Sequence, residues 1–172
     1  MKDVFDQARD AGSSGAKMRG LSQQFLTFTI GSEEYGVDIM TVREIKGWSD
    51  TTRLPNTPDY MRGVMNLRGL IIPIFDLRAR FSGELTNATP KHVAIVLAAG
   101  ERTVSILADT VSDILTVGMD DIKPAPEYET AVDQRYVTGL IAVENRMVVI
   151  LDIEKLLARS LESLDLPSET TH

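Results

Sequence analysis

The sequence contains no cysteine, which excludes disulfides and thiolate metal sites. It has only two histidines, His92 and His172, too few for a histidine-rich metal site. It also lacks the glycine-rich loops that bind nucleotide phosphates and the strand–turn–helix sequence that presents a nucleophilic serine. We therefore expect no cofactor, no metal and no catalytic activity.

Long hydrophobic runs are absent as well. The longest apolar run is Val93–Ala99, whereas a helix needs about 20 residues to cross a bilayer. The N-terminal segment MKDVFDQARDAGSSGAKMRG has no hydrophobic stretch typical of a secretory signal. The net charge of −7 argues against nucleic acid or an anionic membrane as the main partner. We expect a cytoplasmic protein without direct membrane insertion.

An internal repeat is the most informative feature that is present. Residues Tyr60–Leu77 align without a gap on Tyr136–Ile153, at a constant offset in residue number (136 − 60 = 76). A shorter match relates Thr41–Ile45 to Thr110–Ile114, at a second offset (110 − 41 = 69). Two similar halves in a short chain indicate a duplicated small domain with a seam between the halves, which favours a binding scaffold over an enzyme.

Short apolar runs separated by turn residues predict a mostly-β protein, with two small β-barrels as the expected architecture. Leu26, Phe28 and Ile30 alternate with threonines, the pattern of a half-buried strand. Pro73 lies inside another apolar run, so that strand should be at a sheet edge or bulged. Met40, Met61 and Met65 are interpreted mainly as core residues.

Helix signals are few. Asp38 is predicted to cap a short helical turn over Ile39–Ile45, although a strand fits this segment as well. Asp76 should cap a helix that runs through Phe81. Asp152 should cap a final helix, whose apolar positions recur at helical spacing: Ile153, Leu156, Leu157, Leu161 and Leu164.

The expected organisation has three parts. Residues 1–22 are polar and rich in small residues, so we expect a flexible tail. Residues 23–158 should form the ordered domain, with halves at about 23–83 and 90–158 whose strands are exchanged near the seam. Residues 159–172 should hold the helix end and a frayed tail. Ile122–Asp133, with two prolines and many charges, is predicted to be a loop.

Glu44 and Arg68 are charges set among apolar residues. One interpretation is two unrelated surface charges. The other is an ion pair that holds the Arg68 turn against the Glu44 segment, at a surface that a partner covers. An exposed pair contributes only about 0–1 kcal/mol to stability, so a positional role fits better than a stabilising one.

Several long segments are specific enough to compare with known families: QFLTFTIGSEEYGVDI, VREIKG and TRLPNTPDYMRGVMNLRGLIIPIFDLR, followed by VAIVL, IKPAPE, YVTGL and DIEKLL. They resemble the CheW-like domain family of bacterial chemotaxis coupling proteins, and the similarity covers about residues 23–158. The same domain occurs within the chemotaxis kinase CheA and within CheV. Because this sequence has no kinase ATP-binding motif, it is most similar to stand-alone members.

The resemblance implies two packed five-stranded β-barrels and a non-catalytic adaptor. The adaptor would bind the cytoplasmic tip of transmembrane chemoreceptors and the regulatory domain of CheA in a membrane-associated array. By family pattern a receptor helix lies between the barrels, and seven positions match that site: Val42, Glu44, Arg62, Gly63, Arg68, Ile71 and Val93. Leu26 and Ile39 are the candidates for contact with the kinase.

Two alternatives remain open from the sequence. One is a small-molecule regulator or enzyme that uses the seam as a pocket. The other is a related coupling protein that serves a chemosensory pathway other than swimming.

Overall fold

The computed structural model describes residues 21–124 and 133–164. Most of the predicted tails and of the Ile122–Asp133 loop lies outside these ranges. The first five strands are β1 (Ser22–Ile30), β2 (Glu33–Asp38), β3 (Val42–Gly47), β4 (Met61–Leu67) and β5 (Leu70–Asp76). The next five are β6 (Val93–Ala99), β7 (Arg102–Ala108), β8 (Thr110–Gly118), β9 (Val137–Val143) and β10 (Arg146–Leu151). The α-helices are α3 (Leu77–Ser82) and α4 (Ile153–Glu162), and the 3₁₀ turns are η1 (Ile39–Thr41), η2 (Met119–Asp121) and η3 (Gln134–Tyr136).

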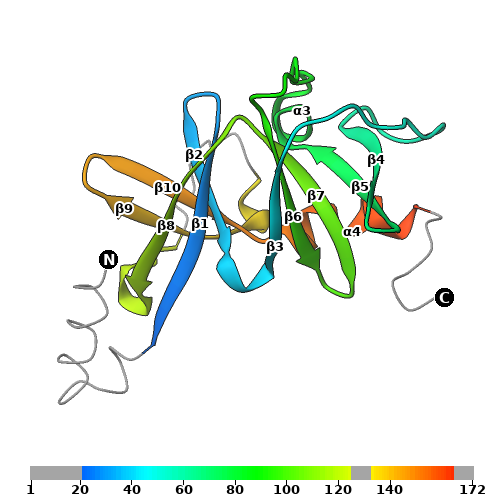
Figure 1. The fold of residues 1–172 in the computed structure, drawn as a ribbon. Helices are drawn as coiled ribbons and strands as arrows, with labels where there is room; N and C mark the ends of the chain where they lie inside the picture. The colour runs from blue at the N-terminus through cyan, green and yellow to red at the C-terminus, as the bar shows by residue number, and fades with distance from the viewer. Residues whose placement is uncertain (1–20, 125–132, 165–172) are drawn as a thin grey trace.

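The strands form two five-stranded sheets, which confirms the mostly-β class (Figure 1). Sheet A has the order β8-β1-β2-β10-β9, and sheet B has the order β3-β6-β7-β5-β4. Each sheet thus takes strands from both repeats. The hairpin formed by the first two strands of one repeat inserts between the last three strands of the other.

The strand pairing shows how closely the repeat is copied. β5 pairs in parallel with β7 at Ile74 and Ser105. β10 pairs in parallel with β2 at Ile150 and Gly36. The two contacts are equivalent, because one offset relates Ile74 to Ile150 (150 − 74 = 76) and the other relates Gly36 to Ser105 (105 − 36 = 69). Residues related by these two offsets are called repeat-equivalent below.

The sheets are open in strand order, so the expected barrels are not closed. In sheet B the chain beyond edge strand β3 returns to the opposite edge, β4, through an isolated bridge between Thr52 and Val64. In sheet A the corresponding bridge joins Lys123 to Leu140, which is repeat-equivalent to Val64. In each sheet a single bridge therefore connects the two edges, where a closed barrel would have two edge strands paired along their length.

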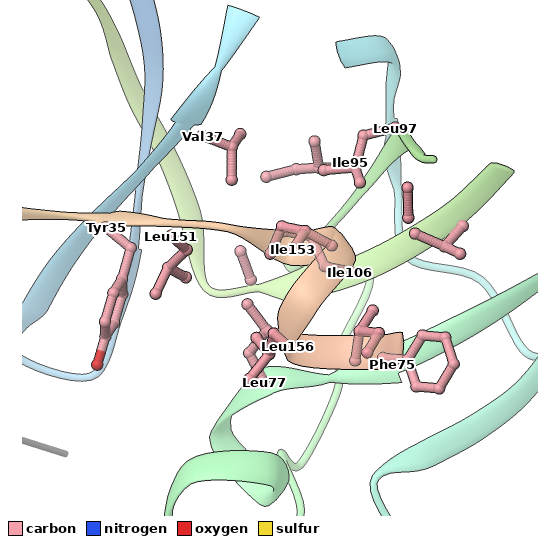
Figure 2. Close-up of a cluster of buried hydrophobic side chains, with 14 of the residues drawn as sticks. Tyr35, Val37, Phe75, Leu77, Ile95, Leu97, Ile106, Leu151, Ile153 and Leu156 are labelled. Atoms are coloured by element: carbon pink, nitrogen blue, oxygen red, sulfur yellow. The ribbon is translucent and has the colours of Figure 1, made fainter. Parts of the chain in front are cut away.

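A large hydrophobic core fills the seam between the sheets (Figure 2). Tyr35 and Val37 enter it from sheet A, and Ile95 and Ile106 enter it from sheet B. Helix α4 covers this core with the predicted apolar stripe, all of whose members are buried: Ile153, Leu156, Leu157, Leu161 and Leu164. The apolar side chains of the stripe therefore pack in the same core as residues of both sheets.

The predicted strand β1 is confirmed, but its middle, residues 25–28, is buried on both faces rather than on one. Leu26 and Phe28 face the seam core, whereas Phe25 belongs to a separate cluster with strands of sheet A. Thr27, expected on a solvent face, is fully buried, and its hydroxyl donates to the carbonyl of Asp113 at 3.2 Å. The alternating pattern identified the apolar face with Leu26 and Phe28. It did not show that the opposite face, which carries Thr27, is buried as well.

Three further predictions need correction. The helical segment Ile39–Ile45 is only the 3₁₀ turn η1, capped by Asp38 as predicted, and a strand follows. Met40 in that turn is 78% exposed rather than buried. β5, which contains Pro73, is an interior strand, but its pairing with β7 begins at Ile74. Pro73 therefore precedes the part of β5 that pairs with β7, so its missing N–H costs no hydrogen bond to that strand.

The predicted aspartate caps are confirmed. The Asp76 carboxylate accepts a hydrogen bond from the Ala79 N–H at the start of α3. Asp152, its repeat-equivalent, accepts from the Lys155 N–H at the start of α4. Asp76 is fully buried and Asp152 is not.

Gly63 is required by a close backbone approach. Its φ is +133°, and a Cβ atom there would lie 2.3 Å from the carbonyl oxygen of Thr52. Gly139, its repeat-equivalent, shows the same crowding, with the Lys123 carbonyl oxygen 2.9 Å from a built Cβ. At both positions the absence of a side chain lets the backbone of the bridging residue, Thr52 or Lys123, approach the strand closely.

Replacing Gly63 with alanine should destabilise the protein by roughly 3 kcal/mol, because strain at positive φ adds to the clash with Thr52. Thermal or urea unfolding measures the loss. Gly69→Ala is the matched control: its φ is +89°, but no atom lies within 4 Å of the new Cβ, so only strain of about 1 kcal/mol is expected. Equal losses in the two variants would contradict the role of close approach at Gly63.

Candidate functional site

Arg68 occupies a two-residue turn between β4 and β5. Arg68 has φ of 54° and Gly69 has φ of 89°, and positive values at both central residues make a type I′ hairpin turn. The Asn66 side chain accepts the Gly69 N–H at 2.8 Å and closes the turn. Because a left-handed conformation is unfavourable for a residue with a Cβ atom, glycine or asparagine is the ordinary choice at the Arg68 position.

The Arg68 guanidinium forms an ion pair with Glu44, as the second interpretation of these charges predicted. The distance from Nη1 to the Glu44 Oε1 is 2.8 Å. Glu44 lies on β3, at one edge of sheet B, and the Arg68 hairpin lies at the other edge. The side chain of Arg68 stays 74% exposed although it is paired, so the ion pair is available to a partner.

The second repeat shows that the fold does not require this ion pair. Glu144 is repeat-equivalent to Arg68 and has nearly the same φ, 55°. Asp113 is repeat-equivalent to Glu44. Both are acidic, so sheet A is built without an ion pair at this place. The Arg68–Glu44 pair is therefore a local property of sheet B.

Arg62 and Gly63 support the site from within. The Arg62 Nη1 donates to the Asp76 carboxylate at 2.9 Å and to the Thr86 carbonyl at 2.7 Å, and its guanidinium stacks on Trp48 at 5.3 Å. Its side chain is only 19% exposed. These contacts fix the segments that flank β4, so Arg62 offers little free surface to a partner.

The remaining receptor candidates also lie on sheet B. Val42 and Val93 are half-buried on β3 and β6 and pack against the seam core. Ile71, on β5, is 43% exposed. The structure thus gathers all seven candidates onto one sheet, and Glu44, Arg68 and Ile71 are the members that offer charged or exposed surface.

The two kinase candidates differ in their surroundings. Leu26 is 3% exposed in the seam core, so its side chain is not available to a partner and that prediction needs correction. Ile39 is half-buried in η1, where it packs against the same core beside the exposed Met40. Ile39 keeps its place as a predicted contact.

Ile45, 44% exposed on β3, was missed from the sequence. It pairs with Ile95, a member of the seam core, so it extends the seam-facing side of sheet B to the surface. Alternation along the strand places it opposite Glu44. The only sequence signal was an apolar residue between two charges, which does not separate an exposed edge position from a buried one.

Other chemistry is not apparent in the described residues. Within 21–124 and 133–164, no group of three or more His, Asp or Glu side chains is arranged to hold a metal ion. None of the helices in these ranges is long and apolar enough to cross a membrane. The site offers the Arg68–Glu44 ion pair, with Lys46 Nζ 3.9 Å from the other Glu44 oxygen.

The fold and the site define a duplicated two-sheet β protein with an ion-paired arginine on one sheet. The chain belongs to the CheW-like domain family, whose model matches residues 24–161. It is 48% identical over 138 residues to the chemotaxis protein CheW of Klebsiella aerogenes, covering 80% of this chain and 83% of that protein. It is 40% identical over 138 residues to the probable chemotaxis protein CheW of Rhizobium etli, covering 80% and 89%. The fold is similar to the scaffolding protein TtCheW from Thermoanaerobacter tengcongensis, with a TM-score of 0.73, 25% identity and coverage of 86% and 92%.

Proposed function

We propose that this protein is a non-catalytic chemotaxis adaptor that couples transmembrane chemoreceptors to the histidine kinase CheA. Membership of the CheW-like family and relatives named as chemotaxis and scaffolding proteins support this role. The observation that carries the proposal is the exposed Arg68–Glu44 ion pair on sheet B. The adaptor acts at the receptor arrays of the membrane.

The receptor surface consists of Arg68 and Glu44, with Ile71, Val42 and Val93 on the opposite, seam-facing side of the same sheet. A receptor helix that lies in a groove needs an apolar strip with a few charges at the rim. Ile71 shares its strand face with Phe75, which is part of the seam core, and therefore continues that core toward solvent. Arg62 and Gly63 hold this surface in shape.

Arg68 gives the surface its specificity. The guanidinium has further N–H donors beyond the one directed at Glu44, and these are free to bond a partner. Because the hairpin turn and the ion pair fix the side chain before binding, less conformational entropy is lost when a partner docks. The receptor contact is therefore pre-organised.

The kinase surface includes Ile39 at the turn after β2. This turn leads directly into β3, so the kinase contact at Ile39 and the receptor residues of β3 lie on neighbouring elements. A scaffold needs both contacts, because both partners must be bound at the same time for receptor state to reach the kinase.

Calorimetric titration tests the proposal. The protein is titrated into the purified CheA regulatory domain and, separately, into a receptor cytoplasmic fragment. Binding to each, and retention of both in one complex on gel filtration, is the expected result. Binding to neither partner overturns the adaptor proposal and favours a small ligand at the seam.

A further inference from the structure

The two repeats also differ at the place where each short helix meets the turn of the inserted hairpin. In one repeat an internal ion pair joins them. The Arg78 guanidinium, on α3, donates to the Asp109 carboxylate at 2.5 Å and to the Thr86 hydroxyl at 2.9 Å. Asp109 also accepts the N–H of Gly31, in the β1–β2 turn, at 2.8 Å. Burial by itself raises the pKa of Asp109, but the hydrogen bonds from Arg78 and Gly31 outweigh it and hold that pKa below its ordinary value.

The other repeat has different chemistry at the equivalent place. Glu154 on α4 is repeat-equivalent to Arg78, and Met40 is repeat-equivalent to Asp109. In both repeats the end of the helix side chain lies beside the glycine of the hairpin turn. A Cβ on Gly31 would lie 4.0 Å from Arg78 Nη2, and a Cβ on Gly100, its repeat-equivalent, would lie 2.6 Å from Glu154 Oε2. An arginine–aspartate pair in one half therefore corresponds to a glutamate and an exposed methionine in the other.

A pocket with a volume of about 310 Å³ opens at this second place, in the seam between the sheets. Its apolar lining comes from β strands and from α4: Phe25, Val37, Ile150, Leu151 and Ile153. Glu154 and Gly100 form part of its rim. Met40, 78% exposed, lies between Asp38 and Thr41, which also line the pocket.

Glu154 is the exposed carboxylate of this pocket that has no protein partner among the described residues. Two other carboxylates line it, but Asp38 accepts the Met40 N–H at 2.9 Å and Asp152 accepts the Lys155 N–H at 3.0 Å. Within the part of the chain that the structure describes, no hydrogen bond or ion pair engages the Glu154 carboxylate. The pocket thus joins an apolar lining, an unpaired acid and an exposed apolar neighbour.

We infer that this pocket is a docking site for a lysine or arginine side chain that a partner protein presents on an apolar surface. The molecule's own other half supplies the pattern, because there a guanidinium occupies the space between the helix and the hairpin turn. Lysine and arginine carry an aliphatic stem that packs on apolar groups while the charged head meets a carboxylate. The five apolar side chains beneath the pocket are each no more than 6% exposed, so the stem lies at the mouth of the pocket against Met40, and the charged head meets Glu154.

The partner that the position favours is the CheA regulatory domain. The pocket borders η1, which contains the predicted kinase contact Ile39, and none of its lining residues belongs to the Arg68–Glu44 surface. This identification rests on the proposed function and adds the chemistry by which the kinase is recognised. The sequence offered only the apolar residues Leu26 and Ile39 as kinase contacts, and the pocket adds the charged residue Glu154 to them.

Glu154→Gln and Glu154→Lys test the inference by titration against the CheA regulatory domain and the receptor fragment. We expect kinase binding to weaken about 10-fold in the glutamine variant and about 100-fold in the lysine variant, since a lost charge pair costs roughly 1.5–3 kcal/mol. The glutamine variant should also show a weaker dependence of kinase binding on salt. Receptor binding should stay unchanged. The melting temperature should fall only slightly, and more in the lysine variant, because Glu154 is exposed but lies in the first turn of α4, where a negative charge favours the helix.

Glu162→Gln and Glu162→Lys are matched controls on the same helix. Glu162 is exposed and lies about 12 Å farther along the α4 axis, so neither change should alter kinase binding. Met40→Ser supplies a second, uncharged perturbation and should also weaken kinase binding without a loss of stability. If the wild type binds the kinase domain and the Glu154 variants bind it equally well, the pocket inference is wrong and the adaptor proposal stands. If the wild type does not bind the kinase domain, the proposed function itself fails, and the kinase assignment with it.

Discussion

Replacing Arg68 with glutamate is expected to abolish measurable receptor binding while the fold stays intact. The change removes the pre-organised cation and places a carboxylate against Glu44, whose Oε1 lies 2.8 Å from the present guanidinium nitrogen. Loss of one partner of an interfacial charge pair costs about 2–5 kcal/mol, which weakens binding by roughly 30-fold or more. Calorimetry with the receptor fragment measures the effect.

The fold should accept this substitution because the protein already contains the same residue in the same conformation. Glu144 occupies the repeat-equivalent turn with φ of 55°, against 54° for Arg68. The lost ion pair is exposed and contributes only about 0–1 kcal/mol. A large fall in melting temperature would show instead that Arg68 is structural.

Two further variants separate the pair from the partner contact. Arg68→Glu combined with Glu44→Arg should restore only part of receptor binding, because the charges are exchanged in position. Full recovery would mean that the pair acts only on itself and makes no direct contact with the receptor. Glu144→Arg, the matched change on sheet A, should leave receptor binding unaltered.

Replacing Asp76 with alanine is expected to cause a severe loss of stability. The buried carboxylate accepts hydrogen bonds from the Ala79 N–H, the Thr86 N–H and hydroxyl, and Arg62. Alanine leaves these donors unpaired, including the poorly exposed Arg62 guanidinium. Breaking such a network costs about 3–5 kcal/mol, and we expect the melting temperature to fall by roughly 10 °C or more.

Asp152→Ala is the control for this prediction. Asp152 is the repeat-equivalent cap and is less buried, and its carboxylate accepts the Lys155 N–H at 3.0 Å. Loss of a helix cap alone costs about 1 kcal/mol, so urea unfolding should separate the two variants clearly. Similar losses would show that Asp76 acts only as a cap and that its contacts with Thr86 and Arg62 contribute little.

The helix caps and the apolar stripe of α4 were predictable because they depend on neighbours a few residues away. Asp76 and Asp152 each accept an N–H three positions later in the chain, a separation that a sequence pattern covers. The repeat itself was visible as a constant offset. The Arg68–Glu44 pair was open between two interpretations, because only a folded sheet B brings its two edges together.

Other features depended on partners that are distant in sequence. The alternation in β1 identified Leu26 and Phe28 as inward residues, but it did not show that the opposite face is also covered and that Thr27 is fully buried. Met40 has the composition of a core residue, yet it projects from a short turn at 78% exposure. Arg62 was matched to the receptor site, but the structure shows Asp76, Trp48 and Thr86 in contact with its guanidinium, which leaves little of it exposed.

The sequence by itself determined the mostly-β class, the aspartate caps, the α4 stripe and the duplication, because periodicity and capping act over a few residues and the repeat is visible as an offset. Only the tertiary structure decided which strands share a sheet, which apolar faces are covered, and which charges stay unpaired. The physical reason is that burial and ion pairing depend on what lies opposite a side chain. In this protein the hairpin of each repeat lies opposite strands of the other, and that exchange closes the site around Asp109 and opens the pocket at Glu154.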